Sequence, residues 1–192
     1  MIDDFLIEYF VNPPQQLKKY NEEDFKNFCR TDVRMYATGK ILFDKTGTMK
    51  KLQDEAKNLL KKEFKKQAKS VIEMNKYELW DELNNLKDLQ EEKSQHFDYV
   101  YFLLLDNTLQ VYKKFLKAET SAPSKLLKFL TDKDFSKRYK IAEFPDKKFV
   151  EKFVKCINKK NFQNIESLIN YTLEAMEGFN INGWRLKSRI SV

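Results

Sequence analysis

The chain has 192 residues, of which 42% are hydrophobic and 14% aromatic, so it can bury a sizeable core. A single histidine, His96, and two distant cysteines, Cys29 and Cys156, argue against a structural zinc site and for reduced, packed thiols. Acids at Asp3 and Asp4 stand where a secretory signal has bases, and no apolar run approaches the roughly 20 residues that span a bilayer. We therefore expect a cytoplasmic protein without a membrane partner.

The formal net charge of the chain is +7, from 36 Lys and Arg against 29 Asp and Glu. A positive balance favours polyanionic partners such as nucleotides or RNA. The competing interpretation is a lysine-rich solvated surface. We favour this second interpretation, because acids and bases are interleaved along nearly the whole chain.

Residues 4–11 alternate in the manner of a β-strand, with Phe5, Ile7, Tyr9 and Val11 on one face. Both faces are largely apolar, which is typical of an interior strand in a covered sheet. The prolines at positions 13 and 14 end this strand, because proline cannot donate a hydrogen bond to a ladder. A second short extended piece is predicted at residues 41–43.

Few glycines and prolines, four of each, predict long helices with few turns. Gly39 is expected to follow the end of the first helix, and Thr48 to cap the start of the second. A C-terminal extension, either irregular or a strand, is expected over residues 180–192. The spacing of apolar residues predicts helices over residues 15–38, 48–69, 72–89, 96–116, 124–130, 134–141, 146–158 and 161–179.

Together these elements predict a mainly α protein, with a helical bundle preceded by one or two β-strands. We expect two domains, over residues 1–47 and 48–192. The segment at residues 99–105 is apolar almost all round its helix. It is therefore expected at the centre of the bundle, with residues 101–105 mostly buried.

Two stretches of the sequence carry a family resemblance. They are IEYFVNPPQQLKKY and RTDVRMYATGKILFDKTGTMKKLQDEAKNLL. Together they resemble polymerase-β-like nucleotidyltransferases, specifically the bacterial group related to aminoglycoside-modifying enzymes. In that family a third active-site carboxylate lies in a strand of the form found at residues 7–10. A proline turn, a helix and an apolar-Asp turn follow, as in residues 13–47. The C-terminal part of this chain, with Gly178-Phe179 and Gly183-Trp184, also looks like the C-terminal part of these proteins.

The resemblance implies that Glu8 is a catalytic and metal-binding carboxylate, and that an intact relative uses Mg²⁺ and ATP or another nucleoside triphosphate. In that family a Gly-Ser motif and an Asp-x-Asp pair precede this strand, and neither is found before Glu8; the adjacent Asp3 and Asp4 would face opposite sides of a strand. Residues 1–47 then correspond to a remnant of the catalytic domain, and residues 48–192 to the helical domain that binds the acceptor, a small molecule or an RNA. Such a chain is expected to be inactive alone. The competing role of Glu8 is an ion pair or an exposed edge position.

A second interpretation is a non-catalytic helical module that contacts protein or RNA, as an antitoxin-like partner would. The Arg-x4–6-His motif of helical ribonucleases is absent. Residues 4–11 are expected either to self-associate or to be covered by residues 41–43 or 184–192. Several side chains are candidates for phosphate contact, ring stacking or RNA contact, but solvated or core roles are favoured for all of them: Arg30, Arg34, Lys40, Tyr77, Trp80, Tyr99, Lys61, Lys62, Lys65 and Lys66.

Overall fold

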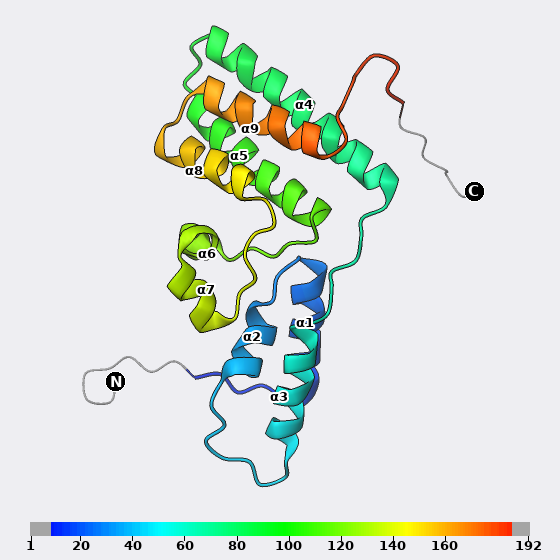
Figure 1. Cartoon of the computed structure of the whole chain (residues 1–192), viewed down its shortest axis with the longest axis vertical. Coiled ribbons are helices and arrows are strands. Elements are labelled where there is room, and N and C mark those ends of the chain that lie inside the picture. The colour runs from blue at the N-terminus through cyan, green and yellow to red at the C-terminus, as the bar shows by residue number, and fades with distance from the viewer. Residues whose placement is uncertain (1–8, 186–192) are drawn as a thin grey trace. The chain divides into compact units, whose positions relative to one another are not determined.

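The computed structural model describes residues 9–185, and all regular secondary structure within this range is helical. This confirms the mainly α class. The predicted strands are not confirmed: residues 9–11 and 41–43 take no regular structure, and residues 4–8 lie outside the described range. The chain divides into two compact units, Met1–Lys62 and Glu63–Val192 (Figure 1). The assignment of residues 1–47 to a catalytic remnant stays a prediction.

The N-terminal unit contains α1 (Pro14–Lys26), α2 (Thr31–Thr38) and α3 (Thr48–Leu59). Pro14 suits the first position of α1, where its missing N–H removes no helical hydrogen bond. Its small core consists of Val33, Ala37 and Ala56, with Phe25, Tyr36, Leu59 and Leu60 packed around them. Because Ala56 belongs to this core, α3 packs on α2 and lies in the first compact unit.

A break at residues 27–30 replaces the continuous helix predicted over residues 15–38. Phe28 adopts a left-handed φ of 53°, which redirects the chain. The carboxylate of Asp24 accepts hydrogen bonds from the backbone N–H groups of Asp32, at 2.7 Å, and Val33, at 3.1 Å. Asp24 therefore caps α2 from the preceding helix. Burial raises the pKa of this carboxyl, and the hydrogen bonds only partly offset that effect.

The start and end of α3 also differ from prediction. Gly47, with a left-handed φ of 73°, is the N-cap, and Thr48 is the first helical residue. The helix ends at Leu59, ten residues before the predicted end. Gly39 does follow α2, but in an extended rather than left-handed conformation.

The C-terminal unit is a bundle of α4 (Lys69–Glu91), α5 (Phe97–Phe115), α8 (Lys147–Asn158) and α9 (Phe162–Ala175). Figure 1 shows α9 between α4 and α8, with α5 against α4 and α9. A 3-10 turn (Pro123–Lys125), α6 (Leu126–Thr131) and α7 (Lys133–Tyr139) connect α5 to α8. The large fully buried side chains come mainly from α5, α8 and α9.

Helix α5 contributes Tyr101, Leu104 and Leu105 to the bundle core, as predicted. The exposed fractions of Phe102 and Leu103, 48% and 52%, show that the prediction of burial was wrong for these two residues. Helix α5 packs on α4 and α9, and these two side chains stay about half exposed. The Tyr101 hydroxyl donates to the carbonyl of Cys156, whose thiol is buried; neither Cys156 nor Cys29 forms a disulfide.

Within residues 9–185, every helix is too short or too polar to cross a lipid bilayer.

Candidate functional site

Glu8, the predicted catalytic and metal-binding residue, lies outside the described residues, so its role stays a prediction. Within residues 9–185, no group of three or more His, Cys, Asp or Glu side chains is placed to hold a metal ion.

Arg30 and Arg34, candidate phosphate contacts that were favoured as solvated charges, instead make contacts within the N-terminal unit. The Arg30 guanidinium donates to the carbonyl of Lys62 at 2.7 Å and lies 5.8 Å from the centre of the Phe25 ring. Arg34 is buried and donates from Nη1 to the carbonyl of Arg30 at 3.2 Å. Lys40 is exposed, at the rim of an apolar hollow described below.

The proposed stacking residues divide between packing and solvent. Tyr77 stacks on Trp184, with ring centres 4.6 Å apart and planes at 10°. The ring centres of Trp80 and Phe179 lie 6.1 Å apart, so residues 179–184 pack against α4 through these rings. Tyr99 is 69% exposed and takes no part in this cluster. Tyr77 and Trp80 thus have a structural role, as favoured from their helical spacing.

The lysine run at residues 61–66 lies in the irregular segment between α3 and α4, instead of on the predicted helix face. The Lys62 ammonium lies 5.3 Å from the centre of the Phe25 ring. Phe64, in the middle of the run, is buried. The run therefore has no common helical face along which its charges would align.

An apolar surface occupies one side of the N-terminal unit. Its most exposed members are Phe10, Leu42 and Phe43, at 77%, 86% and 73%. They border a hollow of about 590 Å³ whose remaining apolar lining comes from Leu17, Met35, Tyr36, Ile41, Met49 and Leu52. Adjacent exposed side chains of this size mark an interaction surface more often than solvent-facing chain. We call these residues the N-terminal apolar surface.

Asp146 is the centre of a hydrogen-bond network in the C-terminal unit. Its carboxylate caps α8 by accepting from the N–H of Phe149 at 2.9 Å. It also accepts from the Tyr112 hydroxyl at 2.6 Å and from the Tyr171 hydroxyl at 2.9 Å. The network therefore joins the start of α8 to α5 and α9.

The network shifts the pKa values of its members in opposite directions. Burial raises the pKa of Asp146, but the hydrogen bonds donated by Tyr112, Phe149 and Tyr171 outweigh it and leave the pKa below its ordinary value. Burial, and then donation to the Asp146 carboxylate, raises the pKa of Tyr112 and of Tyr171. Asp146 is thus held as an anion that fixes both tyrosine rings.

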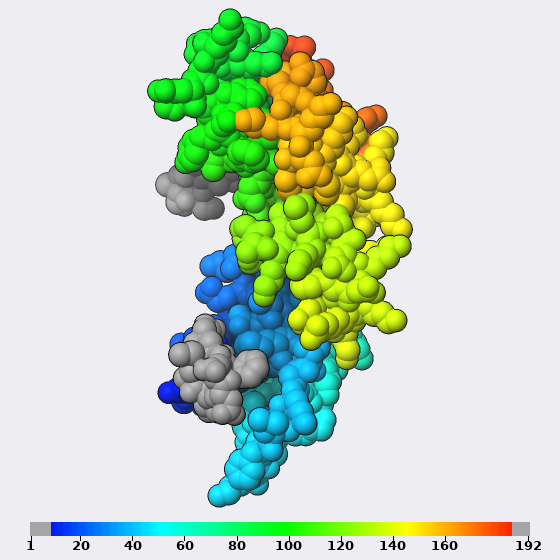
Figure 2. All heavy atoms as spheres, turned by 90° about the vertical axis from the view of Figure 1, so that its left-hand side faces the viewer, coloured from blue at the N-terminus to red at the C-terminus, as the bar shows by residue number. Residues whose placement is uncertain are grey.

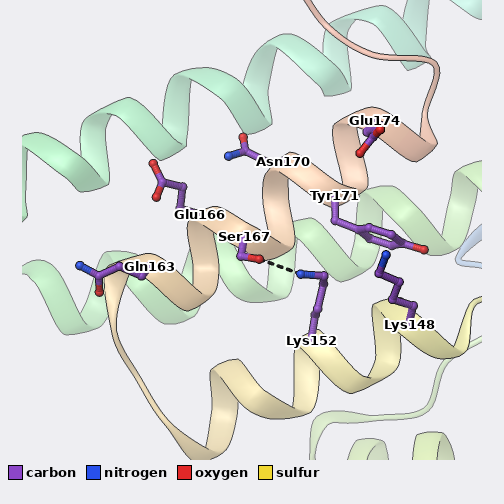
Figure 3. Close-up of a pocket in the computed structure, with 8 residues that line it drawn as sticks. All are labelled: Lys148, Lys152, Gln163, Glu166, Ser167, Asn170, Tyr171 and Glu174. Carbon is purple, nitrogen blue, oxygen red and sulfur yellow. Dashed lines mark hydrogen bonds between the residues drawn. The ribbon is translucent and has the colours of Figure 1, made fainter.

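A groove of about 450 Å³ lies between α8 and α9, and Figure 3 shows its lining. Lys152 donates to the hydroxyl of Ser167 at 2.7 Å. The ammonium groups of Lys148 and Lys152 lie 5.0 and 5.8 Å from the centre of the Tyr171 ring. Cations at these distances are attracted by the ring face, so the aromatic ring and both lysines form one cationic, aromatic strip.

The positive charge of the protein is concentrated in a segment that contains α8, one wall of this groove. Residues 121–160 carry 12 Lys and Arg against 5 Asp and Glu, a net charge of +7, whereas the other 152 residues carry 24 of each sign. Of the twelve bases, eleven are exposed and Lys152 is half-buried. In Figure 2 the yellow-green and yellow side chains of this segment stand out from the surface.

Acids and bases alternate along most of the chain, and this alternation hides the segregation. Counting charge in windows of about one supersecondary unit would have revealed it from the sequence alone.

Comparisons with protein-family models, curated proteins and solved structures found nothing that matches this chain.

Proposed function

We propose that the chain is the helical, acceptor-binding part of a nucleotidyltransferase-like protein of the bacterial aminoglycoside-nucleotidyltransferase-related group. In this proposal the N-terminal apolar surface packs against polypeptide that carries the catalytic sheet. The uncovered state of that surface is the observation that supports it: Leu42 and Phe43 expose more than they bury. A sheet face is apolar and needs a cover of this kind.

The proposal gives Glu8 a role beside a bound nucleoside triphosphate. Its carboxylate would accept the proton of the acceptor hydroxyl. The hydroxyl oxygen then forms a bond to the α-phosphorus, the bond from that phosphorus to the bridging oxygen breaks, and pyrophosphate leaves. The missing Asp-x-Asp pair would come from the sheet-bearing polypeptide, together with the magnesium ions that it binds.

A second candidate function is a helical module that binds another protein without catalysis, as an antitoxin-like partner does. The same apolar surface favours it, because docking through Leu42 and Phe43 requires no transfer chemistry. The two functions differ in whether the assembled protein transfers a nucleotide.

Transfer of label from radiolabelled ATP tests the choice. We expect this chain alone, given Mg²⁺ and a panel of aminoglycosides and RNAs, to transfer no label. The DNA upstream of the Met1 codon is sequenced to find a segment that encodes an Asp-x-Asp pair. The polypeptide encoded by that segment is then produced together with the chain. The pair should transfer label, and Glu8→Gln should abolish transfer while the pair still copurifies.

Two results would contradict the proposal. One is metal-dependent transfer by the chain alone that is lost in Glu8→Gln. The other is an upstream sequence without an Asp-x-Asp segment, which would favour the non-catalytic module.

The N-terminal apolar surface also predicts self-association when the chain is alone, because uncovered apolar surface recruits other copies. Light scattering over a concentration series should show assembly that Leu42→Asp reduces. Tyr99→Asp is the matched control, since Tyr99 is 69% exposed but lies in the other unit. Deletion of residues 1–11 measures the contribution expected from residues 4–11. A full chain that stays monomeric at high concentration contradicts the prediction.

A further inference from the structure

Helix α8 carries four lysines on one face. Lys148, Lys152, Lys155 and Lys159 follow one another at spacings of four, three and four residues, and Lys159 is the C-cap. Residues at this spacing form a single stripe along a helix. Eleven residues at 1.5 Å rise give the stripe a length of about 16 Å. We call these four residues the α8 lysine stripe.

In the described part of the chain no carboxylate forms an ion pair with the stripe, although Glu166 and Glu174 also line the groove. Lys148, Lys155 and Lys159 are exposed, and the ammonium of Lys152 donates to a neutral hydroxyl, that of Ser167. The ion pairs found nearby use other lysines: Lys147 with Glu143, and Lys160 with Asp98. The acids on α9, Glu166 and Glu174, point away from α8 in Figure 3.

We propose that the α8 lysine stripe binds the phosphate backbone of a nucleic acid, with Tyr171 as an adjoining aromatic contact. Phosphodiesters are regularly spaced anions, and a row of cations that tracks them supplies affinity without base recognition. Lysine contacts a phosphate as a point charge, so the stripe is suited to sequence-independent binding. Aromatic side chains beside a basic groove are typical of single-strand binding.

Other anionic partners fit the stripe less well. The apolar face of α8, formed by Phe149, Phe153 and Cys156, is buried in the bundle core, so the helix has no apolar face to insert into a lipid surface. Protein interfaces are depleted of lysine and centred on apolar or aromatic anchors. Among the described residues, none of the exposed large apolar side chains belongs to α8.

This proposal goes beyond the proposed function and does not rest on it. The binding needs neither nucleoside triphosphate nor metal, and it uses residues of the C-terminal unit alone. Measurements in the presence of a chelator therefore test it separately from nucleotidyl transfer.

The test compares two variants of the full chain that both lower the net charge from +7 to +3. One replaces Lys148, Lys152, Lys155 and Lys159 with glutamine, a good helix former. The control replaces the lysine run between α3 and α4 with glutamine: Lys61, Lys62, Lys65 and Lys66. Circular dichroism verifies that both variants fold.

Fluorescence anisotropy measures binding to a single-stranded RNA of about 20 nucleotides, longer than usual single-strand site sizes. The other probes are a single-stranded DNA of the same sequence, the corresponding DNA duplex, and polyglutamate. Four phosphate contacts give a salt slope of about −2.8, so wild-type affinity for the single strand should fall about 50-fold between about 50 and 200 mM salt. At the lower salt concentration we expect the affinity of the stripe variant to be at least about 50-fold below that of the wild type. The affinity of the control variant should stay within about threefold of the wild-type value.

Each outcome is decisive. Loss in the stripe variant with retention in the control supports the proposal, and the RNA, DNA and duplex arms then identify the preferred nucleic acid. The proposal is overturned by equal loss in both variants, by the absence of binding to any nucleic acid at the lower salt concentration, or by equally tight binding to polyglutamate.

Discussion

Replacing Leu104 with alanine is expected to destabilise the C-terminal unit by about 2–5 kcal/mol. Leu104 is 1% exposed and lies among the buried residues of the bundle. Truncation removes contacts that close packing cannot restore, because the surrounding helices relax only partly.

The neighbouring residue of the same helix provides the control for this change. Leu103 is 52% exposed, so Leu103→Ala makes the same chemical change on the outer face and should cost at most about 1 kcal/mol. Both tryptophans, Trp80 and Trp184, belong to the C-terminal unit, so their fluorescence during urea unfolding reports on that unit. Equal costs for the two variants would show that α5 is not a central helix.

Replacing Asp146 with alanine should remove two kinds of stabilisation at once. Loss of the α8 cap costs about 1 kcal/mol. The hydroxyl of Tyr112, a residue only 2% exposed, also loses its acceptor, which costs a further amount of about 1–3 kcal/mol. Urea unfolding followed by tryptophan fluorescence measures the sum.

Asp132→Ala is the matched control, because Asp132 caps α7 through the N–H of Phe135 at 2.9 Å and has no tyrosine partner in the described structure. It should lose only the cap contribution. A cost for Asp146→Ala no larger than that of Asp132→Ala would show that the tyrosine hydrogen bonds do not contribute to stability.

The same network predicts a dependence on pH. The folded-state pKa of Asp146 is depressed, so the unfolded chain binds a proton first as the pH falls. Its contribution is therefore fully present above the unfolded pKa, near 3.8, and is lost as the pH falls through the lower folded value. The stability difference between wild type and Asp146→Asn should shrink over that range. The pKa of Glu82 is raised by burial, which has the opposite sign, so only the difference between the two proteins isolates Asp146.

Local sequence patterns were sufficient to predict the helical class and most of the C-terminal unit. Helices α4, α5, α8 and α9 each repeat apolar residues at helical spacing, as Phe149, Phe153 and Cys156 do in α8. Such a repeat depends only on which residues share a face, and that is fixed by helix geometry. The concentration of positive charge in residues 121–160 is equally a property of the sequence, although it emerges only when charge is counted by segment.

The predictions that failed depend on contacts that reach beyond a single helix. The break before α2 needs the Asp24 carboxylate to reach Asp32 and Val33, which apolar periodicity does not report. The exposure of Phe102 and Leu103 depends on which sides of α5 have neighbouring helices. Apolar character alone cannot distinguish a buried face from one that another polypeptide covers.

Only the tertiary structure brings together the groups of the candidate sites. Asp146 is 34 residues from Tyr112 and 25 residues from Tyr171 in sequence. Both tyrosine hydroxyls nevertheless donate to its carboxylate. The sequence contains the α8 lysine stripe as a spacing, but packing decides its accessibility. Because the bundle buries Phe149, Phe153 and Cys156, the adjacent face with Lys148 and Lys152 is left beside Tyr171 in an open groove.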